Sequence, residues 1–306
     1  MAINTEILAQ DLLFPEGPVA LNNGSVLVVE IARGTLTHID RSGHKEIVAE
    51  LGGGPNGAAI GPDGHCYVCN NGGVEWHEQD SMLCPGNIAA DYSGGRIERV
   101  NLSTGSSEVL YAHANGLPLR GPNDIVFDEA GGFWFTDTGK SHETVVERGA
   151  IYYATIDGNH IERVLFPYDL PNGIALSPDG ATLYFSETLS ARIWQFQLSA
   201  PGKIAGPPTP FNPENLLYGA PDLCGYDSMC LEANGNVCQA TLFKGGVSVI
   251  CPSGELREFV DLPDPFVTNI CFSNIEPTRA YATLSGTGRL IELEWPRPGL
   301  ALNYQT

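Results

Sequence analysis

The stretch that decides the fold is Arg120-Gly121-Pro122-Asn123-Asp124, which opens a short apolar run ending at Asp128. Seven residues after Asn123 the pair Ala130-Gly131 marks a turn, and a second apolar run, residues 132–136, follows it. Small and polar residues such as Gly, Asn and Asp favour tight turns because they tolerate positive φ angles. The stretch therefore predicts a β-hairpin whose first strand begins with a carboxamide and a carboxylate.

The same arrangement occurs six times along the chain. In each copy a polar residue, which we call the anchor, stands seven residues before the first residue of a turn. The six anchors are Glu16, Asn56, Asn123, Asn172, Asp227 and Asn269. Five of the six turns have Gly at their second position. Regular repetition of one β-rich unit is typical of the blades of a propeller.

Further β-rich segments follow each hairpin, and their number indicates the size of a blade. A third segment follows every hairpin, at residues 35–39, 96–100, 150–156, 192–198, 246–250 and 289–295. A fourth usually follows, but the last repeat has none, and the N-terminal run 6–13 precedes the first anchor. Pairing this run with the last repeat would close the ring and cover its exposed edges. The sequence thus predicts an all-β, single-domain protein over residues 1–306: a six-bladed β-propeller with four antiparallel strands per blade, closed by the N-terminal strand.

Composition narrows the choice of partners and compartment. The 306 residues carry a net charge of −20, which argues against binding to nucleic acid because phosphates would be repelled. No apolar run is long enough for a transmembrane helix, and the N-terminus lacks the features of a signal peptide. We therefore expect a cytoplasmic protein without a membrane partner, whose eight cysteines are buried and reduced. The sequence does not predict the oligomeric state.

In a propeller the anchors, the loops between second and third strands, and the connections between blades all lie at one end of the central channel. Three of these segments are long, at residues 71–95, 138–149 and 207–225. Long loops in a compact domain are commonly functional. We expect them to form walls or lids over the channel mouth, with plain surface loops as the alternative.

The anchors themselves indicate a chemistry. Every anchor offers an oxygen atom, and Glu16 and Asp227 offer carboxylates. Carboxylate and amide oxygens that converge on one axis suit a hard divalent cation such as Ca²⁺ or Mg²⁺. The alternative is that Asn and Asp stand here only because they favour turns. Six polar anchors in register favour the metal site.

These residues resemble the family of senescence marker protein 30, gluconolactonase and luciferin-regenerating enzyme, related to Drp35 lactonase and diisopropylfluorophosphatase. The resemblance spans nearly the whole chain, and its specific parts are Phe14-Pro15-Glu16-Gly17-Pro18, Gly121-Pro122-Asn123-Asp124-Ile125-Val126, Phe133-Trp134-Phe135-Thr136-Asp137, Pro171-Asn172-Gly173-Ile174-Ala175-Leu176-Ser177-Pro178-Asp179-Gly180 and Tyr226-Asp227-Ser228-Met229.

The resemblance implies one catalytic divalent cation, most often Ca²⁺, with Zn²⁺, Mn²⁺ and Mg²⁺ as alternatives. It implies Glu16, Asn123, Asn172 and Asp227 as the ligands, while Asn56 and Asn269 would support them or contact the substrate. Sugar lactonases of this family often have Arg two residues before the third anchor. Here that position is Gly121 and Arg120 stands one place further away, which weakens an assignment to gluconolactone.

The favoured interpretation is a metal-dependent hydrolase that opens a small lactone. Asp227 would act as general base or as nucleophile, with Asn123 beside it as a catalytic metal ligand. The candidate substrate contacts are Arg120, His77, His142, Trp76 and Tyr226. Two alternatives stay open: hydrolysis of an organophosphate or ester at the same site, and a non-catalytic propeller that uses Ca²⁺ for stability and binds a partner.

Overall fold

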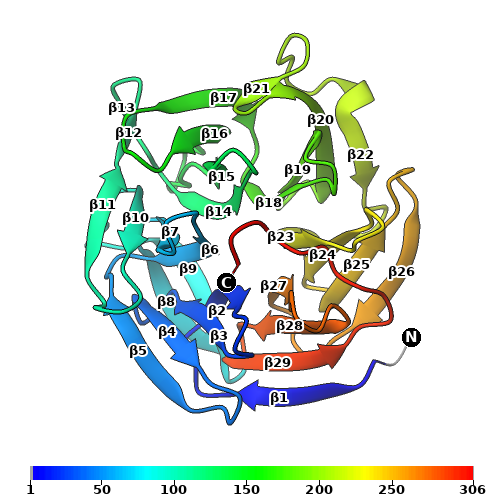
Figure 1. Ribbon diagram of the computed structural model, residues 1–306. Coiled ribbons are helices and arrows are strands. Elements are labelled where there is room, and N and C mark those ends of the chain that lie inside the picture. Colours follow the sequence, from blue (N-terminus) through cyan, green and yellow to red (C-terminus); the bar gives the residue numbers. More distant parts are fainter. Residues whose placement is uncertain (1–2, 306) are drawn as a thin grey trace.

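Six antiparallel sheets surround a central channel in the computed structural model, which describes residues 3–305 (Figure 1). Each sheet is one blade, and its first strand faces the channel. Blade 1 contains β2 (Pro15–Ala20), β3 (Val26–Glu30), β4 (Thr35–Ile39) and β5 (Lys45–Glu50). Blade 2 contains β6 (Pro55–Ile60), β7 (Cys66–Asn70), β10 (Arg96–Val100) and β11 (Ser107–Tyr111). Blade 3 contains β14 (Pro122–Phe127), β15 (Gly132–Asp137), β16 (Gly149–Thr155) and β17 (Ile161–Tyr168).

The second half of the ring repeats the pattern with two variations. Blade 4 contains β18 (Pro171–Leu176), β19 (Thr182–Glu187), β20 (Arg192–Ala200), β21 (Lys203–Ile204) and β22 (Leu216–Gly219). Blade 5 contains β23 (Gly225–Leu231), β24 (Val237–Leu242), β25 (Gly246–Ile250) and β26 (Leu256–Asp261). Blade 6 contains β27 (Val267–Phe272), β28 (Arg279–Leu284), β29 (Arg289–Glu294) and the N-terminal β1 (Thr5–Ala9).

The predicted closure of the ring is confirmed. The N-terminal strand β1 pairs antiparallel with β29, so the first and last parts of the chain share one blade. Each end of the chain thereby covers an edge that the other would leave exposed. The six-bladed, four-stranded architecture predicted from the repeat is therefore the observed one.

The apolar core lies between neighbouring blades. In β14 and β15 every residue is buried, because both faces of an inner strand pack against another blade. Tyr67 of blade 2 packs on Phe127 and Phe133 of blade 3, with ring centroids 5.1 and 5.7 Å apart. Outer strands such as β5 are mainly exposed. This explains why the inner strands have continuous apolar runs instead of the alternation of a sheet with one wet face.

One predicted loop is partly a strand. We expected residues 207–225 to form a wall or lid, but β22 within this segment pairs with β20 as the outer strand of blade 4. A short 3₁₀ turn, Pro213–Asn215, precedes it. The prediction of a loop is wrong for this part, because these residues supply the outer strand of blade 4. The strand has only four residues and follows a proline-rich segment, so it is not visible in the sequence pattern. Only residues 220–224 return toward the anchors.

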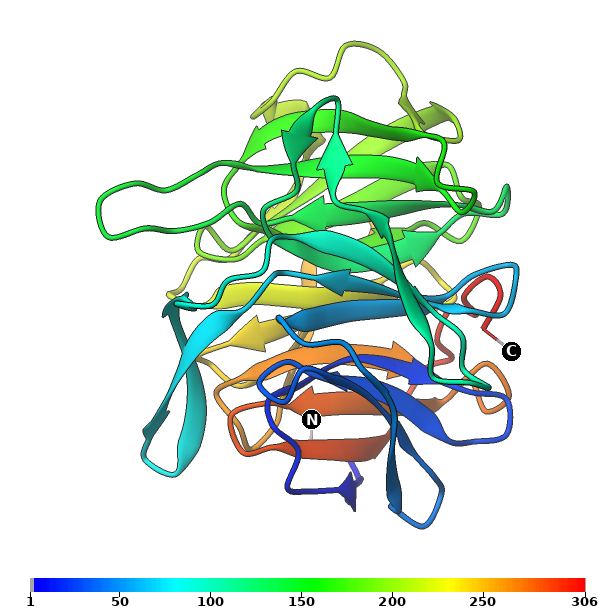
Figure 2. The ribbon, with the colours of Figure 1, turned by 90° about the vertical axis from the view of Figure 1, so that its left-hand side faces the viewer.

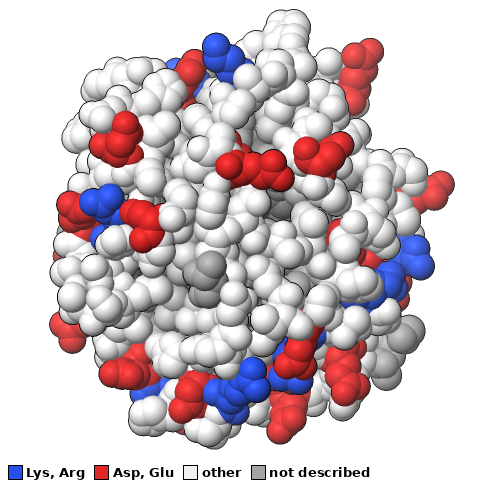
Figure 3. Space-filling view, in the orientation of Figure 1, with Lys and Arg blue, Asp and Glu red and all other residues white. Residues whose placement is uncertain are grey.

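The C-terminal segment crosses the other end of the channel (Figure 1). Its contacts reach three blades: the Leu300 N–H donates to the carbonyl of Leu231 at 2.8 Å, Asn303 Nδ2 to that of Phe127 at 3.1 Å, and Gln305 Nε2 to that of Ala20 at 2.6 Å. On this face charged side chains lie mainly toward the circumference (Figure 3). Anchors and C-terminal segment therefore occupy opposite ends of the channel.

The long insertions project from the anchor end. Figure 2 shows the hairpin of β8 (Val74–Gln79) and β9 (Met82–Ile88), and the loop between β15 and β16, extending on the side away from the C-terminus. All eight cysteines are free and seven are buried, as expected for reduced thiols. Among residues 3–305, no helix has the length and apolar character needed to cross a bilayer.

Candidate functional site at the anchor end of the channel

Every anchor lies at an irregularity of its strand. The pairing register between first and second strands shifts next to Glu16, Asn56, Asn123, Asn172, Asp227 and Asn269. A bulge turns a side chain out of the regular alternation and is common beside functional sites. The repeated shifts explain how six separate strands direct their anchors toward one axis.

Glycine after the anchor permits the close approach of neighbouring first strands. A Cβ atom on Gly57 would lie 2.5 Å from the carbonyl oxygen of Asn123, and one on Gly173 would lie 2.7 Å from that of Asp227. No side chain fits at these distances. The Asn-Gly pairs of the sequence therefore serve packing around the axis as well as the placement of oxygen donors.

Hydroxyl groups of the second strands connect one anchor to the next. Thr136 Oγ1 accepts a hydrogen bond from the Asp124 N–H at 3.0 Å and donates one to the Asn172 carbonyl at 2.6 Å. Ser186 Oγ likewise accepts from the Gly173 N–H at 2.9 Å and donates to the Asp227 carbonyl at 2.8 Å. We call these two arrangements the hydroxyl relays. They fix three of the four predicted metal ligands relative to one another.

Acidic side chains at the ends of second strands hold the chain just before the anchors. Asp137 accepts hydrogen bonds from the Arg120 and Gly121 N–H groups, both at 2.8 Å. Glu187 accepts from the Asp169 N–H at 2.7 Å, and Glu30 from the Leu13 N–H at 2.8 Å. Neither these three acids nor the relays were predicted from the sequence, although Phe135-Thr136-Asp137 and Phe185-Ser186-Glu187 repeat the same pattern.

Glu16 presents one occupied and one free oxygen. Its Oε2 atom accepts hydrogen bonds from Asn269 Nδ2 at 2.7 Å and from the Gly17 N–H. Its Oε1 atom is buried and has no hydrogen-bond partner among the described residues. An unpaired buried carboxylate oxygen is costly, so a bound ion or water at this oxygen would stabilise the folded protein.

Asn123 and Asn172 show the same feature. The Oδ1 atoms of both side chains are buried without a hydrogen-bond partner within residues 3–305. Asn172 is oriented by Nδ2, which donates to Thr188 Oγ1 at 3.1 Å. Asp227 stands in the same ring of anchors and is partly exposed. The oxygens left free on three of these residues, together with a carboxylate on the fourth, are donors that suit a hard divalent cation.

The donor set is not rich in charged groups. Within the described part of the chain, no three His, Cys, Asp or Glu side chains come together as a metal-binding group. A site on these anchors would instead combine two carboxylates with two amide oxygens, a set that is typical of Ca²⁺ rather than of thiophilic metals.

Three carboxyl groups near the axis have raised pKa values. Burial raises the pKa of Glu16 to about 7, and the hydrogen bonds from Asn269 and Gly17 oppose this shift. Burial and the charge of Glu16 raise the pKa of Asp124 to about 8. The pKa of Asp227 lies well above its usual range for the same two reasons. A bound cation would lower these pKa values and favour the ionised carboxylates.

Asp124 is a site residue that the sequence analysis did not select. Its Oδ1 accepts from the Ile125 N–H at 2.9 Å and its Oδ2 from the Ile174 N–H at 3.3 Å. It stands directly after the third anchor, where the first, second and fourth repeats have Gly. That departure from the repeat was the available signal.

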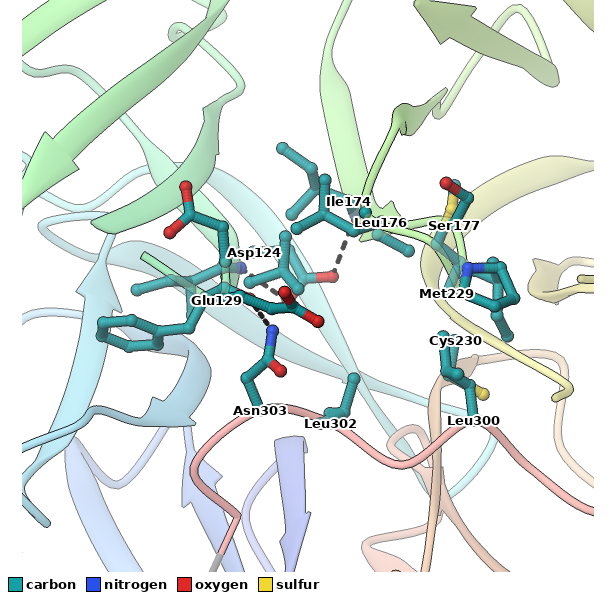
Figure 4. A pocket seen from close by; sticks show the side chains of 18 of the residues that line it. Asp124, Glu129, Ile174, Leu176, Ser177, Met229, Cys230, Leu300, Leu302 and Asn303 are labelled. Atoms are coloured by element: carbon teal, nitrogen blue, oxygen red, sulfur yellow. Dashed lines mark hydrogen bonds between the residues drawn. The ribbon is translucent and has the colours of Figure 1, made fainter. Parts of the chain in front are cut away.

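Asp124 also marks the inner end of a cavity behind the anchors. The cavity has a volume of about 590 Å³ and extends toward the C-terminal segment, where Leu300, Leu302 and Asn303 line it (Figure 4). Asn269 lies at its inner end with Asp124. The anchors therefore separate this inner space from the mouth that the long loops surround.

The residues predicted to contact the substrate lie in three places: near Glu147, on the β8–β9 hairpin, and in the core. Arg120 and His142 are about half exposed and both lie near Glu147, with Nε–Oε2 and Nε2–Oε1 distances of 3.4 and 3.8 Å. His77 is exposed on the β8–β9 hairpin. Tyr226 is only 1% exposed and packs in the core between blades 4 and 5, so its side chain does not reach the mouth.

The β8–β9 hairpin forms one wall of the mouth. Trp76 packs on Phe14 of the segment before β2, with ring centroids 4.9 Å apart. The Leu83 N–H donates to the carbonyl of Gly286 in blade 6 at 2.9 Å. The hairpin therefore extends from blade 2 across blade 1 to blade 6, as expected for a wall.

The two remaining anchors, Asn56 and Asn269, which were expected to support the ligands or contact the substrate, are both buried.

Known proteins are similar to this chain in sequence and in fold. A family model described as the SMP-30/gluconolactonase/LRE-like region matches residues 14–286. A gluconolactonase of Zymomonas mobilis is 26% identical over 292 residues, which cover 87% of this chain and 75% of that protein. Lactonase drp35 of Staphylococcus saprophyticus is 27% identical over 242 residues, covering 78% and 67%.

A solved structure shares the fold. The calcium-binding protein regucalcin from Agrobacterium tumefaciens matches with a TM-score of 0.75 at 19% identity, covering 99% of each chain. At this identity the match establishes the propeller architecture alone.

Proposed function

Because the chain belongs to the SMP-30/gluconolactonase/LRE-like family, we propose that it is a divalent-metal-dependent hydrolase that opens a lactone ring. Relatives named gluconolactonase and lactonase drp35 support this reaction class. The proposed ligands are Glu16, Asn123, Asn172 and Asp227. The proposed ion is Ca²⁺, with Zn²⁺, Mn²⁺ and Mg²⁺ as alternatives.

The observation that carries the proposal is the set of unpaired oxygens. Glu16 Oε1, Asn123 Oδ1 and Asn172 Oδ1 are buried and have no hydrogen-bond partner among the described residues. Each belongs to a residue that the sequence predicts as a ligand. A bound cation would satisfy all of these oxygens and would balance the negative charges of Glu16 and Asp227. It would also polarise the ring carbonyl and stabilise the negative charge that develops on its oxygen.

The residues of the chain have separate tasks in this scheme. Asp227 is the only one of the four proposed ligands that is partly exposed. It accepts a proton from the attacking water and returns it to the ring oxygen of the lactone as the carbon–oxygen bond breaks. Direct attack by its carboxylate on the carbonyl carbon is the alternative. Asn123 and Asn172 hold their amide oxygens in place, the latter through Thr188. Arg120 and His142, beside Glu147 at the mouth, are available for polar groups of the substrate.

The test is hydrolysis of a panel of sugar-derived and aliphatic lactones, aryl esters and one phosphotriester, followed by proton release. The protein is first treated with chelator, and Ca²⁺, Zn²⁺, Mn²⁺ or Mg²⁺ is then restored. We expect at least one lactone to be opened only with metal present. Faster turnover of the phosphotriester or esters than of any lactone would reassign the substrate. No turnover by folded, metal-loaded protein would favour a binding module.

A further inference from the structure

The loops at the anchor end carry the most exposed apolar side chains of the described chain. Among large apolar residues, the four highest exposed fractions belong to Leu223 (93%), Leu189 (66%), Val146 (59%) and Val145 (57%). Leu117 (56%) and Val109 (54%) come next, and Phe243 is 51% exposed. The first four and Phe243 lie in loops between second and third strands or between blades, which end at the mouth. Large apolar side chains exposed together around one opening often mark a binding site.

Leu189 is linked to the proposed metal ligands through its neighbour Thr188. It follows Thr188, whose Oγ1 accepts the hydrogen bond from Asn172 Nδ2 at 3.1 Å. The carbonyl of Thr188 accepts from the Tyr226 N–H, also at 3.1 Å, and Tyr226 precedes Asp227. The backbone that carries Leu189 therefore contacts both strands that supply these ligands.

Phe243 lies on the other side of the Asp227 strand. It follows Leu242, which pairs with Gly225, and a Cβ atom on Gly225 would lie 3.1 Å from the Phe243 ring. Gly225 is two residues from Asp227, a distance of about 7 Å along a β-strand. A group attached to a substrate at the anchors therefore needs only a short chain to reach this ring.

Leu223 lies between Leu189 and Phe243 along the chain, and two valines of blade 3 lie in a separate loop. Leu223 lies in the segment 220–224, which is tied to the β19–β20 turn by the Ala220 N–H donating to the Ala191 carbonyl at 2.9 Å. Val145 and Val146 lie in the β15–β16 loop of blade 3. We call Leu189, Leu223 and Phe243, the three residues flanking β23, the apolar rim.

We propose that the lactone opened by this protein carries an apolar substituent, alkyl or aryl, which packs on the apolar rim. This inference rests on the proposed function and names its substrate class. Burial of apolar surface against the rim favours such a substituent, whereas the apolar side chains of the rim offer no hydrogen-bond partner to the hydroxyl groups of a sugar lactone. A lipid surface is disfavoured as occupant, because the chain has a net charge of −20 and acidic residues such as Asp222 and Glu143 stand beside the exposed apolar groups.

The test compares γ-lactones that differ only in the alkyl chain on the ring. The value of kcat/KM is measured by proton release for γ-butyrolactone, γ-valerolactone and γ-nonalactone, with metal present. A fully buried methylene group is worth about fourfold. For four methylenes on a half-open rim we expect kcat/KM to rise at least tenfold from γ-valerolactone to γ-nonalactone. In Leu189→Ser combined with Phe243→Ser, this ratio should fall to about one or two.

Leu256→Ser is the matched control. Leu256 is 44% exposed on the outer strand β26 of blade 5, away from the mouth, and its substitution should leave the chain-length ratio unchanged. Equal kcat/KM for all three γ-lactones in the wild-type protein would overturn the apolar substituent but leave lactone opening intact. Failure to open any lactone, with folded and metal-loaded protein, would overturn the proposed function itself.

An interface between copies of the chain would give a different pattern. If the rim served self-association, the double variant would change the sedimentation coefficient while the chain-length ratio stayed at its wild-type value. That result would contradict the inference. An unchanged sedimentation coefficient with a reduced ratio supports it.

Discussion

The two oxygens of Glu16 have different surroundings, and this difference defines the role of the residue. Oε2 is fixed by Asn269 and the Gly17 N–H, while Oε1 has no partner among the described residues. One oxygen thus orients the carboxylate and the other stays available for a cation. Asn172 shows the same division between Nδ2 and Oδ1. Ligands held in this way need little rearrangement when the cation binds.

Replacing Asp227 by Asn should separate metal binding from catalysis. The amide keeps an oxygen donor but cannot accept a proton at neutral pH or act as nucleophile. We expect kcat to fall by about 10²–10⁴, the usual contribution of a general base, while most of the metal affinity remains. Proton release and metal titration of the same preparation measure both quantities.

Asp222→Asn is the control for this experiment, because Asp222 is an exposed carboxylate in the segment just before β23. Its substitution removes the same charge without touching the anchors and should leave kcat unchanged. Full activity of Asp227→Asn would show that the base lies elsewhere.

The raised pKa values of Glu16 and Asp124 predict how stability depends on pH without metal. These carboxyls titrate near 7 and 8 in the folded protein, against 4.5 and 3.8 ordinarily. The folded state therefore holds more protons than the unfolded chain between these values. The contribution of the two groups to the free energy of unfolding is largest below about pH 4 and is lost as the pH rises through 7 to 8.

Thermal unfolding in chelator between pH 5 and 8.5 tests this dependence. The melting temperature of Glu16→Gln should fall less with rising pH than that of the wild type, because the variant lacks one of the groups. Glu46→Gln, at an exposed position on β5, is the control. Parallel curves for the wild type and Glu16→Gln would show that this carboxyl does not titrate with a raised pKa.

Individual residues of the candidate site were predictable where they occupy the same position in every repeat. The constant offset of seven residues between anchor and turn identified the six anchors. The family resemblance then implied Glu16, Asn123, Asn172 and Asp227 as the metal ligands among them. Asp124 was missed because a position after the anchor is not obviously axial. Tyr226 was expected at the mouth, yet it is buried, since neighbours in a strand point to opposite sides and only one of them reaches the axis.

At the scale of elements, the hydroxyl relays connect adjacent blades at the height of the metal ligands. Thr136→Val removes the bridge between the Asp124 N–H and the Asn172 carbonyl while keeping the shape of the side chain. Two buried backbone groups then lose their partner, so we expect a loss of about 1–3 kcal/mol in unfolding free energy, together with weaker metal binding. Denaturant unfolding and metal titration check the two effects.

Thr209→Val is the comparison, because Thr209 is exposed in the segment before β22. It should change neither quantity. If Thr136→Val unfolded at the wild-type denaturant concentration, the relays would not stabilise the ring.

Strands were predictable where clear turn residues separate one apolar run from the next. The third strands at residues 35–39, 96–100 and 246–250 were predicted with the bounds that the structure shows. The outer strand β22 was not, because its four residues follow a proline-rich approach and receive their partner only from the tertiary structure. Outer strands are specified by pairing more than by local pattern.

At the scale of the whole molecule, closure by β1 is the feature on which the ring depends. Deletion of residues 1–9 would expose the edge of β29 and remove the backbone pairing between β1 and that strand. We expect a lower melting temperature, by about 2–4 °C for each kcal/mol lost in domains of 150–250 residues, and a tendency to aggregate. Thermal scans with light scattering measure both.

Ile7→Ser provides the control for the deletion. Ile7 is half exposed on β1, so the substitution retains the pairing of the strand and should leave melting nearly unchanged. A deletion variant as stable as the wild type would contradict the role of β1 in closing the ring.

The anchors lie between two open regions of the channel, the mouth at one end and the inner cavity at the other. The anchors face the long loops at one end, and the cavity behind them ends at the C-terminal segment (Figure 4). The topology of the ring was predictable from the repeat, because four strands per unit fix where the anchors lie. The path of the C-terminal segment was not, since it depends on hydrogen bonds to three distant blades.

In the proposed site, oxygen atoms of Glu16, Asn123, Asn172 and Asp227 hold one divalent cation on the axis. The most direct measurement is calorimetric titration of chelator-treated protein with Ca²⁺, and then with Zn²⁺, Mn²⁺ and Mg²⁺, in the wild type and in Asn172→Leu. We predict that at least one of these ions binds at a single axial site in the wild type and at least tenfold more weakly in the variant. Unchanged affinity in Asn172→Leu, or no binding of any of the four ions to folded wild-type protein, would contradict this proposal.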